Sequence, residues 1–195
     1  MIRLLSLAAL VVAFASAAPS NAQVLTYVTD LAGGGEGSGS PGTGFARVDY
    51  DPIAHTLSLD TNFSGLLGTT TASHIHSPTT LPFTGNAGVA TQLPSFVGFP
   101  LGVTSGSYSE TFDLTMASSW NPAFITAQGG TPATAEAAFA SHLSTGRAYL
   151  NIHTSQFTGG EIRGYFALIP EPATLGLAGI GALGLLLARR SSRRG

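Results

Sequence analysis

Two histidines separated by one residue are the first side chains in this sequence that could do chemistry. They are His74 and His76, in the segment ASHIHSP. If the segment is a strand, both imidazoles project from one face, roughly 6.5 to 7 Å apart along the chain, while Ile75 points to the other face. Two imidazoles so placed can hold one metal ion, and zinc and copper suit imidazole ligands.

A second stretch, YLNIHTSQFTGGEIRGYF, alternates apolar and polar residues on both sides of a Gly-Gly pair. This pattern predicts a β-hairpin with one apolar face and one polar face. The polar face carries Asn151, His153, Glu161 and Arg163. Glu161 could accept a hydrogen bond from His153 and fix its tautomer, or pair with Arg163. Alternatively, the face only sets the strand register, and an ion pair on it contributes under about 1 kcal/mol.

These side chains together outline a hypothetical zinc or copper site. Its members are His74, His76, His153 and Glu161, the last either as a ligand or as a hydrogen-bond partner of a ligand. An open coordination position would permit catalysis, and the histidine pair of an all-β protein is similar to that of copper–zinc superoxide dismutase. That family needs more histidines and a bridging ligand, and the remaining histidines here are only His55 and His142. A bound ion could also simply stabilise the fold.

The elements that must position these residues are short strands. Runs rich in β-branched and aromatic residues alternate with Gly, Pro and Ser turns, which is typical of a sandwich or barrel. Thr131, Pro132 and the following Ala-rich run predict one helix up to Leu143, and the Gly-rich tract 33–44 predicts a long flexible loop. We therefore predict an all-β domain, an antiparallel sandwich or barrel of about eight strands with one short helix. The predicted strands are 24–31, 45–50, 56–62, 71–76, 88–93, 108–114, 147–153 and 161–168.

The composition narrows the class of partner. Only 9% of the 195 residues are charged, against roughly 25% in a typical soluble domain. Between residues 23 and 169, three arginines and no lysine stand against nine acidic residues, a local charge of −6. Nucleic acid is therefore not an expected partner, since its phosphates require clustered basic residues. The absence of cysteine excludes disulfides, thiolate metal ligands and thiol nucleophiles.

Both ends of the chain have the patterns of targeting segments. Residues 1–22 begin with Arg3, continue with an apolar run and end in small residues, as secretory signal peptides do. Residues 173–188 are an apolar run of 16 residues, shorter than the ~20 of a permanent membrane helix, and arginines follow it directly. We expect three parts: a signal peptide at 1–22, a β domain at 23–169 and a sorting signal with a transmembrane sorting helix at 170–195.

The C-terminal segment resembles a PEP-CTERM sorting signal. Its marks are Pro170, Glu171 and Pro172, the short apolar run, and the basic end with Arg189 and Arg190. The resemblance implies a Gram-negative bacterium, export through the Sec translocon, transient insertion in the inner membrane, and cutting near Pro-Glu-Pro by an exosortase. It further implies release to the cell surface or into an exopolysaccharide matrix.

The two histidine-bearing segments, HIHSP and YLNIHTSQFTGGEIRGYF, resemble the CHRD domain over about residues 24–168. Ser73 and Ser77 replace an Ala and a Gly of the family pattern. By this resemblance the signature positions are His74, His76, Asn151, His153, Thr154, Gly160, Glu161, Ile162, Arg163 and Gly164. The family supplies no catalytic set. We therefore expect a non-enzymatic surface or extracellular-matrix protein that binds exopolysaccharide or a surface protein, with the metal-binding domain as the alternative.

Overall fold

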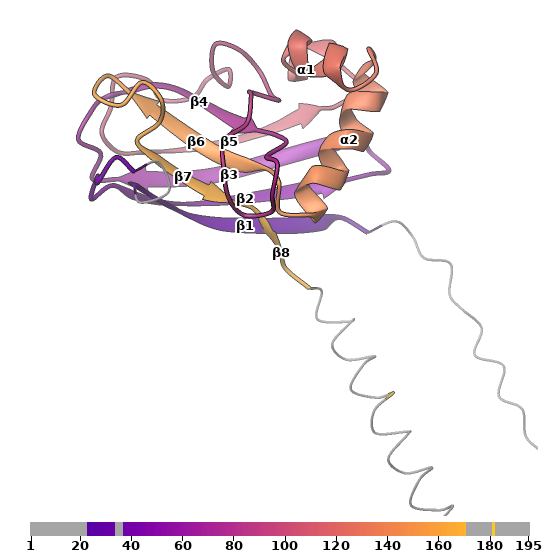
Figure 1. Cartoon of the computed structure of the whole chain (residues 1–195), viewed down its shortest axis with the longest axis horizontal. Helices are drawn as coiled ribbons and strands as arrows, with labels where there is room; N and C mark the ends of the chain where they lie inside the picture. Colours follow the sequence, from indigo (N-terminus) through magenta and orange to yellow (C-terminus); the bar gives the residue numbers. More distant parts are fainter. Residues whose placement is uncertain (1–22, 34–36, 171–180, 182–195) are drawn as a thin grey trace, which may run out of the picture.

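The computed structural model describes residues 23–33, 37–170 and 181. In these residues the chain forms one antiparallel sheet of eight strands, ordered β4-β6-β7-β1-β2-β3-β5, with β8 beside β1. The sheet curves into a half-barrel (Figure 1), so the all-β prediction is confirmed. The strands are β1 (Leu25–Ala32), β2 (Thr43–Asp51), β3 (Thr56–Ser64), β4 (Thr70–His76), β5 (Gly106–Asp113), β6 (Tyr149–Thr154), β7 (Ile162–Tyr165) and β8 (Ala167–Leu168), and the helices are η2 (Ala117–Ser119), α1 (Pro122–Ala127) and α2 (Pro132–Ser144).

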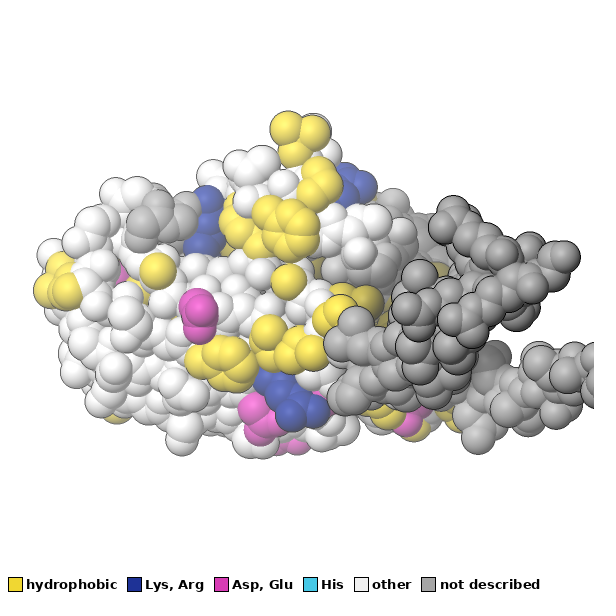
Figure 2. Space-filling view, turned by 90° about the horizontal axis from the view of Figure 1, so that it is seen from below, with side chains coloured by type: hydrophobic (Ala, Val, Ile, Leu, Met, Phe, Trp, Pro, Cys, Tyr) yellow, Lys and Arg dark blue, Asp and Glu magenta, His cyan; other side chains and the backbone are white. Residues whose placement is uncertain are grey.

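Alternating side chains in the central strands build the core. Val48 of β2 pairs with Tyr27 of β1 and with Leu59 of β3, and all three side chains are fully buried. Because successive residues of a strand face opposite sides, the intervening side chains lie on the outer face, where most are polar. Figure 2 shows one side of the molecule, on which uncharged groups far outnumber charged ones, as the composition leads one to expect.

Helix α2 forms where the sequence predicts it. The Thr131 hydroxyl accepts a hydrogen bond from the backbone N–H of Thr134, whose own hydroxyl accepts one from the N–H of Thr131, and Pro132 occupies the first turn. This reciprocal cap satisfies two N–H groups that would otherwise lack partners. One face of the helix then packs against the core through Ala135, Glu136, Phe139 and Leu143.

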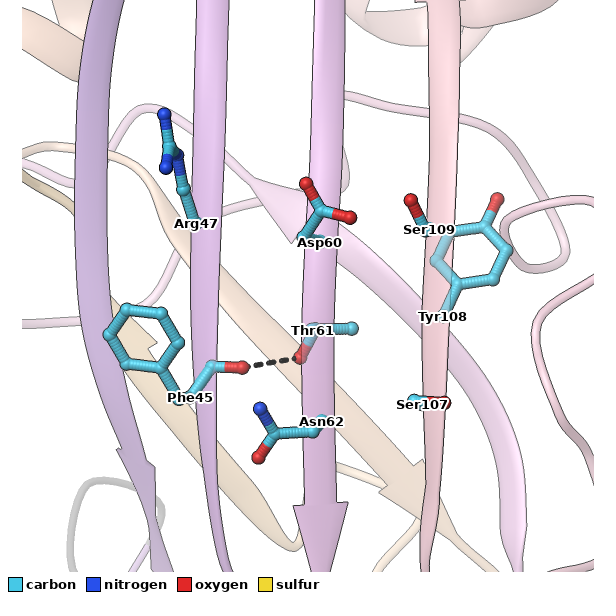
Figure 3. A pocket seen from close by; sticks show the side chains of 8 residues that line it. All are labelled: Phe45, Arg47, Asp60, Thr61, Asn62, Ser107, Tyr108 and Ser109. Carbon is cyan, nitrogen blue, oxygen red and sulfur yellow. Dashed lines mark hydrogen bonds between the residues drawn. The ribbon is translucent and has the colours of Figure 1, made fainter.

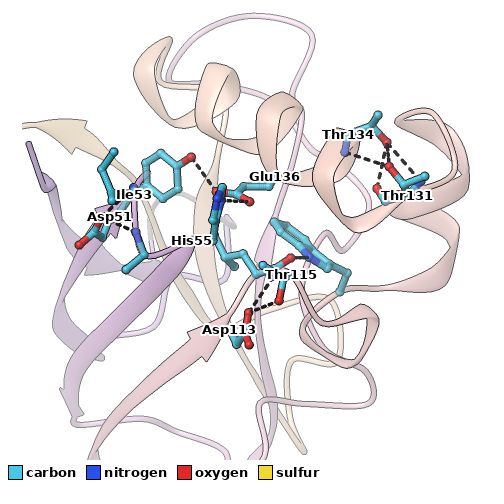
Figure 4. A network of polar contacts seen from close by, with 12 residues as sticks. Asp51, Ile53, His55, Asp113, Thr115, Thr131, Thr134 and Glu136 are labelled. Carbon is cyan, nitrogen blue, oxygen red and sulfur yellow. Dashed lines mark hydrogen bonds and ion pairs between the residues drawn. The ribbon is translucent and has the colours of Figure 1, made fainter. Parts of the chain in front are cut away.

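A buried carboxylate ties α2 to the sheet (Figure 4). Glu136 accepts a hydrogen bond of 2.9 Å from the hydroxyl of Tyr50 and lies 3.0 Å from Nδ1 of His55. Burial, together with the hydrogen bond to Glu136, raises the pKa of Tyr50. The β2–β3 turn is closed by Asp51, which accepts a hydrogen bond of 2.8 Å from the N–H of Ile53. This corner of the molecule is thereby fixed to α2.

The segment 88–93 corrects one strand prediction. It forms only isolated bridges, between Val89 and His76 and between Thr91 and Trp120. The segment instead crosses the outer edge of β4. There the N–H of Ala90 donates a hydrogen bond of 2.9 Å to the carbonyl of Ile75. The short helix α1 was also absent from the prediction, which contained a single helix.

The predicted signal peptide, residues 1–22, and the apolar run 173–188 apart from residue 181 lie outside the described residues. Among the residues that are described, no helix combines the length and the apolar character needed to cross a membrane.

Candidate metal centre

Strands β4 and β6 bring three of the predicted residues together. His74 and His76 share the outer face of β4, while Ile75 between them is fully buried in the core, as the sequence predicts. On the adjacent strand β6, His153 is the register partner of Ala72 and thus lies on the same outer face. One ring nitrogen from each histidine lies within 4.8 Å of the others.

Backbone carbonyls determine the tautomer of each imidazole. Nδ1 of His76 lies 2.9 Å from the carbonyl oxygen of Ala87, and Nδ1 of His153 lies 2.9 Å from that of Thr158. Nε2 of His74 contacts the carbonyl oxygen of Pro94. Since a carbonyl oxygen only accepts hydrogen bonds, each of these nitrogens carries the proton in the neutral ring. The other nitrogen of each ring is therefore unprotonated and carries a free lone pair.

The three rings meet at one place, and two of the lone pairs face each other. Nε2 of His76 faces Nε2 of His153 at 3.4 Å, and Nδ1 of His74 is buried without a hydrogen-bond partner among the described residues. Two facing lone pairs repel each other, so the arrangement favours a cation or a proton between them. Two nitrogens bound to one tetrahedral zinc at 2.0–2.1 Å stand about 3.4 Å apart. The His76–His153 separation therefore already fits a shared ion.

Burial keeps these imidazoles neutral. It lowers the pKa of His76 to about 4 and also lowers the pKa of His74 and of His153. Neutral imidazole is the form that binds metal ions, so at neutral pH no proton has to leave before a metal enters.

Neighbouring side chains hold the site and the loop above it. The His76 ring stacks on Tyr149 with 4.9 Å between ring centres, and the guanidinium of Arg163 lies 5.0 Å from the centre of the same tyrosine ring. Arg163 also donates a hydrogen bond of 2.6 Å to Asn86, and Tyr165 donates one of 2.5 Å to the carbonyl of Gly85. The segment that supplies the carbonyl for His76 is thus anchored to β7, which is the kind of outer support that orients metal-binding histidines.

Glu161 does not belong to this cluster, and the predicted hydrogen bond from His153 to Glu161 is wrong. Its carboxylate is fully buried beside Thr154, the residue that follows His153 in β6, and it accepts four hydrogen bonds. The donors are the hydroxyls of Ser40 and Thr154 and the backbone N–H groups of Leu67 and Gly68. Burial by itself raises its pKa, but these hydrogen bonds outweigh burial and leave the pKa lowered. Part of the Gly-rich loop predicted as flexible is thereby attached to the sheet.

The other signature residues shape the backbone around the histidine cluster. Asn151 donates a hydrogen bond of 3.0 Å to the carbonyl of Gly159, and a Cβ at Gly160 would come within 2.3 Å of the Asn151 side chain. Gly160 also has a φ of +131°, which disfavours any other residue. At Gly164 a Cβ would meet the carbonyl oxygen of Asp30 at 2.2 Å, because β7 passes close to β1 there. These positions shape the hairpin that carries His153.

The remaining histidines lie elsewhere. His55 contacts Glu136 as described, and Nδ1 of His142 lies 3.0 Å from the hydroxyl of Ser77.

The carbonyl partners of the three clustered histidines could not be found from the sequence, because a backbone carbonyl carries no residue-type signal.

A second polar feature lies on the outer face of β2, β3 and β5 (Figure 3). It is an open groove of about 480 Å³ crossed by two rows of side chains. The first row is Phe45, Asn62 and Ser107, and the second is Arg47, Asp60 and Ser109. The Phe45 residue is 40% exposed. Within the described part of the chain, the side chains of Asp60 and Asn62 make no hydrogen bond, so they can meet a ligand.

Comparison with known families gives two matches. The model of the CHRD domain matches residues 27–166, and the model of the PEP-CTERM protein-sorting motif matches residues 168–194. A search of curated proteins and a search of solved structures found no match. The first matched range contains the histidine cluster, Glu161 and the groove.

Proposed function

Because this chain belongs to the CHRD domain family and carries a PEP-CTERM sorting motif, we propose that its released domain is a non-enzymatic surface or matrix protein that binds one zinc or copper ion. The sorting motif makes the chain an exported protein that an exosortase processes through a membrane-anchored intermediate on its way to the cell surface. Neither family is enzymatic. We further propose a Gram-negative host and entry through the Sec translocon.

One observation supports the metal proposal more than any other. His74, His76 and His153 each donate one ring N–H to a backbone carbonyl, and one nitrogen of each ring lies within 4.8 Å of a nitrogen of the other two. A cluster assembled only for hydrogen bonding would not leave a buried nitrogen of His74 without a donor. Three imidazoles with an open fourth position suit zinc or copper, and on this chain the ion would stabilise a surface protein that lacks disulfides.

A direct test uses residues 23–170, purified without a histidine tag. We expect one Zn²⁺ or Cu²⁺ per chain and a melting temperature that falls on chelation, because the ion binds only the folded state. His76→Ala abolishes both effects. His55→Asn serves as the control, since His55 lies outside the cluster and its φ of 55° is one that asparagine tolerates. Equal metal uptake by wild type and His76→Ala would contradict the proposal.

The groove of Figure 3 supports a second candidate function, the binding of a neutral matrix polysaccharide. The exposed ring of Phe45 can stack on the C–H face of a sugar ring. Asp60 and Asn62 offer acceptors and donors for sugar hydroxyls, and their strands hold them in a fixed register. The local charge of −6 between residues 23 and 169 disfavours an acidic polymer, so we propose a neutral one.

The polysaccharide proposal is tested by NMR titration of the domain with short neutral oligosaccharides. We expect shifts confined to the groove strands, weakened in Phe45→Ala and Asn62→Ala. Ser64→Ala, an exposed position at the end of the same strand β3, is the control and should leave them unchanged. Absence of shifts at saturating oligosaccharide would exclude this partner without affecting the metal proposal.

A further inference from the structure

Both ends of the folded domain leave the sheet at the same place. Leu25 opens β1 opposite Tyr50, and the N–H of Ile169 donates a hydrogen bond of 2.9 Å to the carbonyl of Thr26. Pro170 is therefore a neighbour of the first residues of β1. Figure 1 shows the start of β1 and the end of β8 on one side of the half-barrel.

No spacer separates the domain from its sorting motif. The motif match starts at residue 168, and Leu168 is paired with Tyr27 in the sheet. The apolar run of the sequence starts at Ala173, four residues after Ile169. Four extended residues span at most about 14 Å, and each headgroup layer of a bilayer is about 5–8 Å thick. When residues 173–188 are in the membrane, this end of the sheet is held at the headgroups.

The surface at this end of the sheet carries exposed apolar side chains that suit a place among the lipid headgroups. Thr56 pairs with both Asp51 and Asp113, so the β2–β3 turn and the end of β5 lie side by side. Ile53 at the tip of the turn is 68% exposed, and Met116 after β5 is 53% exposed. Exposed apolar residues at the same end, beside the chain exits, are Val24, Leu168 and Ile169. Single exposed apolar side chains are ordinary, whereas a group at the membrane-facing end is suited to a lipid interface.

The charges at this end indicate how the contact forms. Asp51 and Asp113 stand among the apolar side chains and would be repelled by anionic lipids. Electrostatic attraction is therefore not the driving force. A short tether raises the effective concentration of the bilayer instead, and the contact weakens once the tether is cut.

We propose that the precursor sits directly on the bilayer through this end of the sheet, with Ile53 and Met116 among the lipid headgroups, until cleavage releases it. The inference rests on the sorting motif and the fold and is independent of the metal site. The exosortase would then meet a cleavage site located between the sheet and the membrane.

The absence of cysteine makes the test direct. Single cysteines replace Ile53, Met116 or, as the control, Leu67, which is 51% exposed beyond the opposite end of β3. The full chain is placed in vesicles of phosphatidylethanolamine and phosphatidylglycerol, and a fluorophore on each cysteine is quenched with spin-labelled lipids. We expect quenching at positions 53 and 116 and none at position 67. Equal exposure of all three probes to water would overturn the proposal.

A spacer variant separates tethering from intrinsic binding. A flexible Gly-Ser insertion after Pro170, several times longer than the native connection, should abolish the lipid quenching at Ile53→Cys. Quenching that survives the insertion would show that the tether does not seat the domain, and the proposal would be wrong.

Discussion

The hydroxyl of Thr154 donates a hydrogen bond of 2.7 Å to Oε2 of Glu161, a carboxylate with no exposed surface. The same carboxylate accepts hydrogen bonds from Ser40 of the β1–β2 loop and from the N–H of Gly68 before β4. One buried charge thus holds three segments of the chain together. It also explains why a glutamate among the signature positions can lie beside the histidine cluster without belonging to it.

Glu161→Gln should therefore destabilise the domain strongly. The amide turns one acceptor into a donor facing N–H groups, and we expect a loss of about 2–4 kcal/mol in the free energy of unfolding. Urea unfolding measures it. Glu110→Gln, at an exposed residue of β5, is the matched control, with a change within about 0.5 kcal/mol. A Glu161→Gln effect no larger than this control would show that the carboxylate is not structural.

The effect of Glu161 should depend on pH. Its pKa is lowered in the folded state, so the stability it contributes is fully present above the unfolded value of about 4.3. That contribution is lost as the pH falls through the lowered pKa. The stability difference between wild type and Glu161→Gln should consequently shrink below about pH 4. A difference that stays constant from neutral to strongly acidic pH would contradict this prediction.

Gly160→Ala should be costly although it adds a single methyl group. The new Cβ would meet Asn151 at 2.3 Å, at a φ of +131°. We expect a loss of about 2–4 kcal/mol from strain and overpacking. The neighbouring Gly159→Ala meets nothing within 4 Å and should be almost neutral. Thermal unfolding of the two variants compares them, and similar melting temperatures would refute this role for the glycine.

The raised pKa of Tyr108 should lower the stability of the domain at alkaline pH. Burial raises its pKa to about 12, while an unfolded tyrosine ionises near about 10. The contribution is fully present below that unfolded value and is lost as the pH rises toward the folded one. Unfolding free energies measured on both sides of pH ~10 should fall more for wild type than for Tyr108→Phe. Parallel curves would count against this account.

The sequence predicted the elements whose partners are local or periodic. The alternation from Tyr149 to Phe166 predicted a hairpin, and the structure pairs Ile152 with Ile162 and Leu150 with Gly164 on one face. The cap at Thr131 similarly located α2. The shared face of His74 and His76 follows from the strand period alone.

Contacts between distant segments could not be predicted in this way. Glu161 precedes β7 at the turn, where the alternation no longer decides the direction of a side chain, and its donors at Leu67 and Gly68 are more than 90 residues away. Residues 88–93 have a strand pattern but pack across the edge of β4. Such placements depend on tertiary packing, which overrides local propensity.

X-ray absorption spectroscopy of the zinc- or copper-loaded domain tests the central claim most directly. The facing nitrogens of His76 and His153 at 3.4 Å, with His74 beside them, predict three imidazole nitrogens about 2.0–2.1 Å from the metal. Replacing any one of the three histidines by alanine should remove one imidazole from the shell or abolish binding. A shell of oxygen atoms only, or a spectrum that is the same in His74→Ala, His76→Ala and His153→Ala as in wild type, would contradict the account.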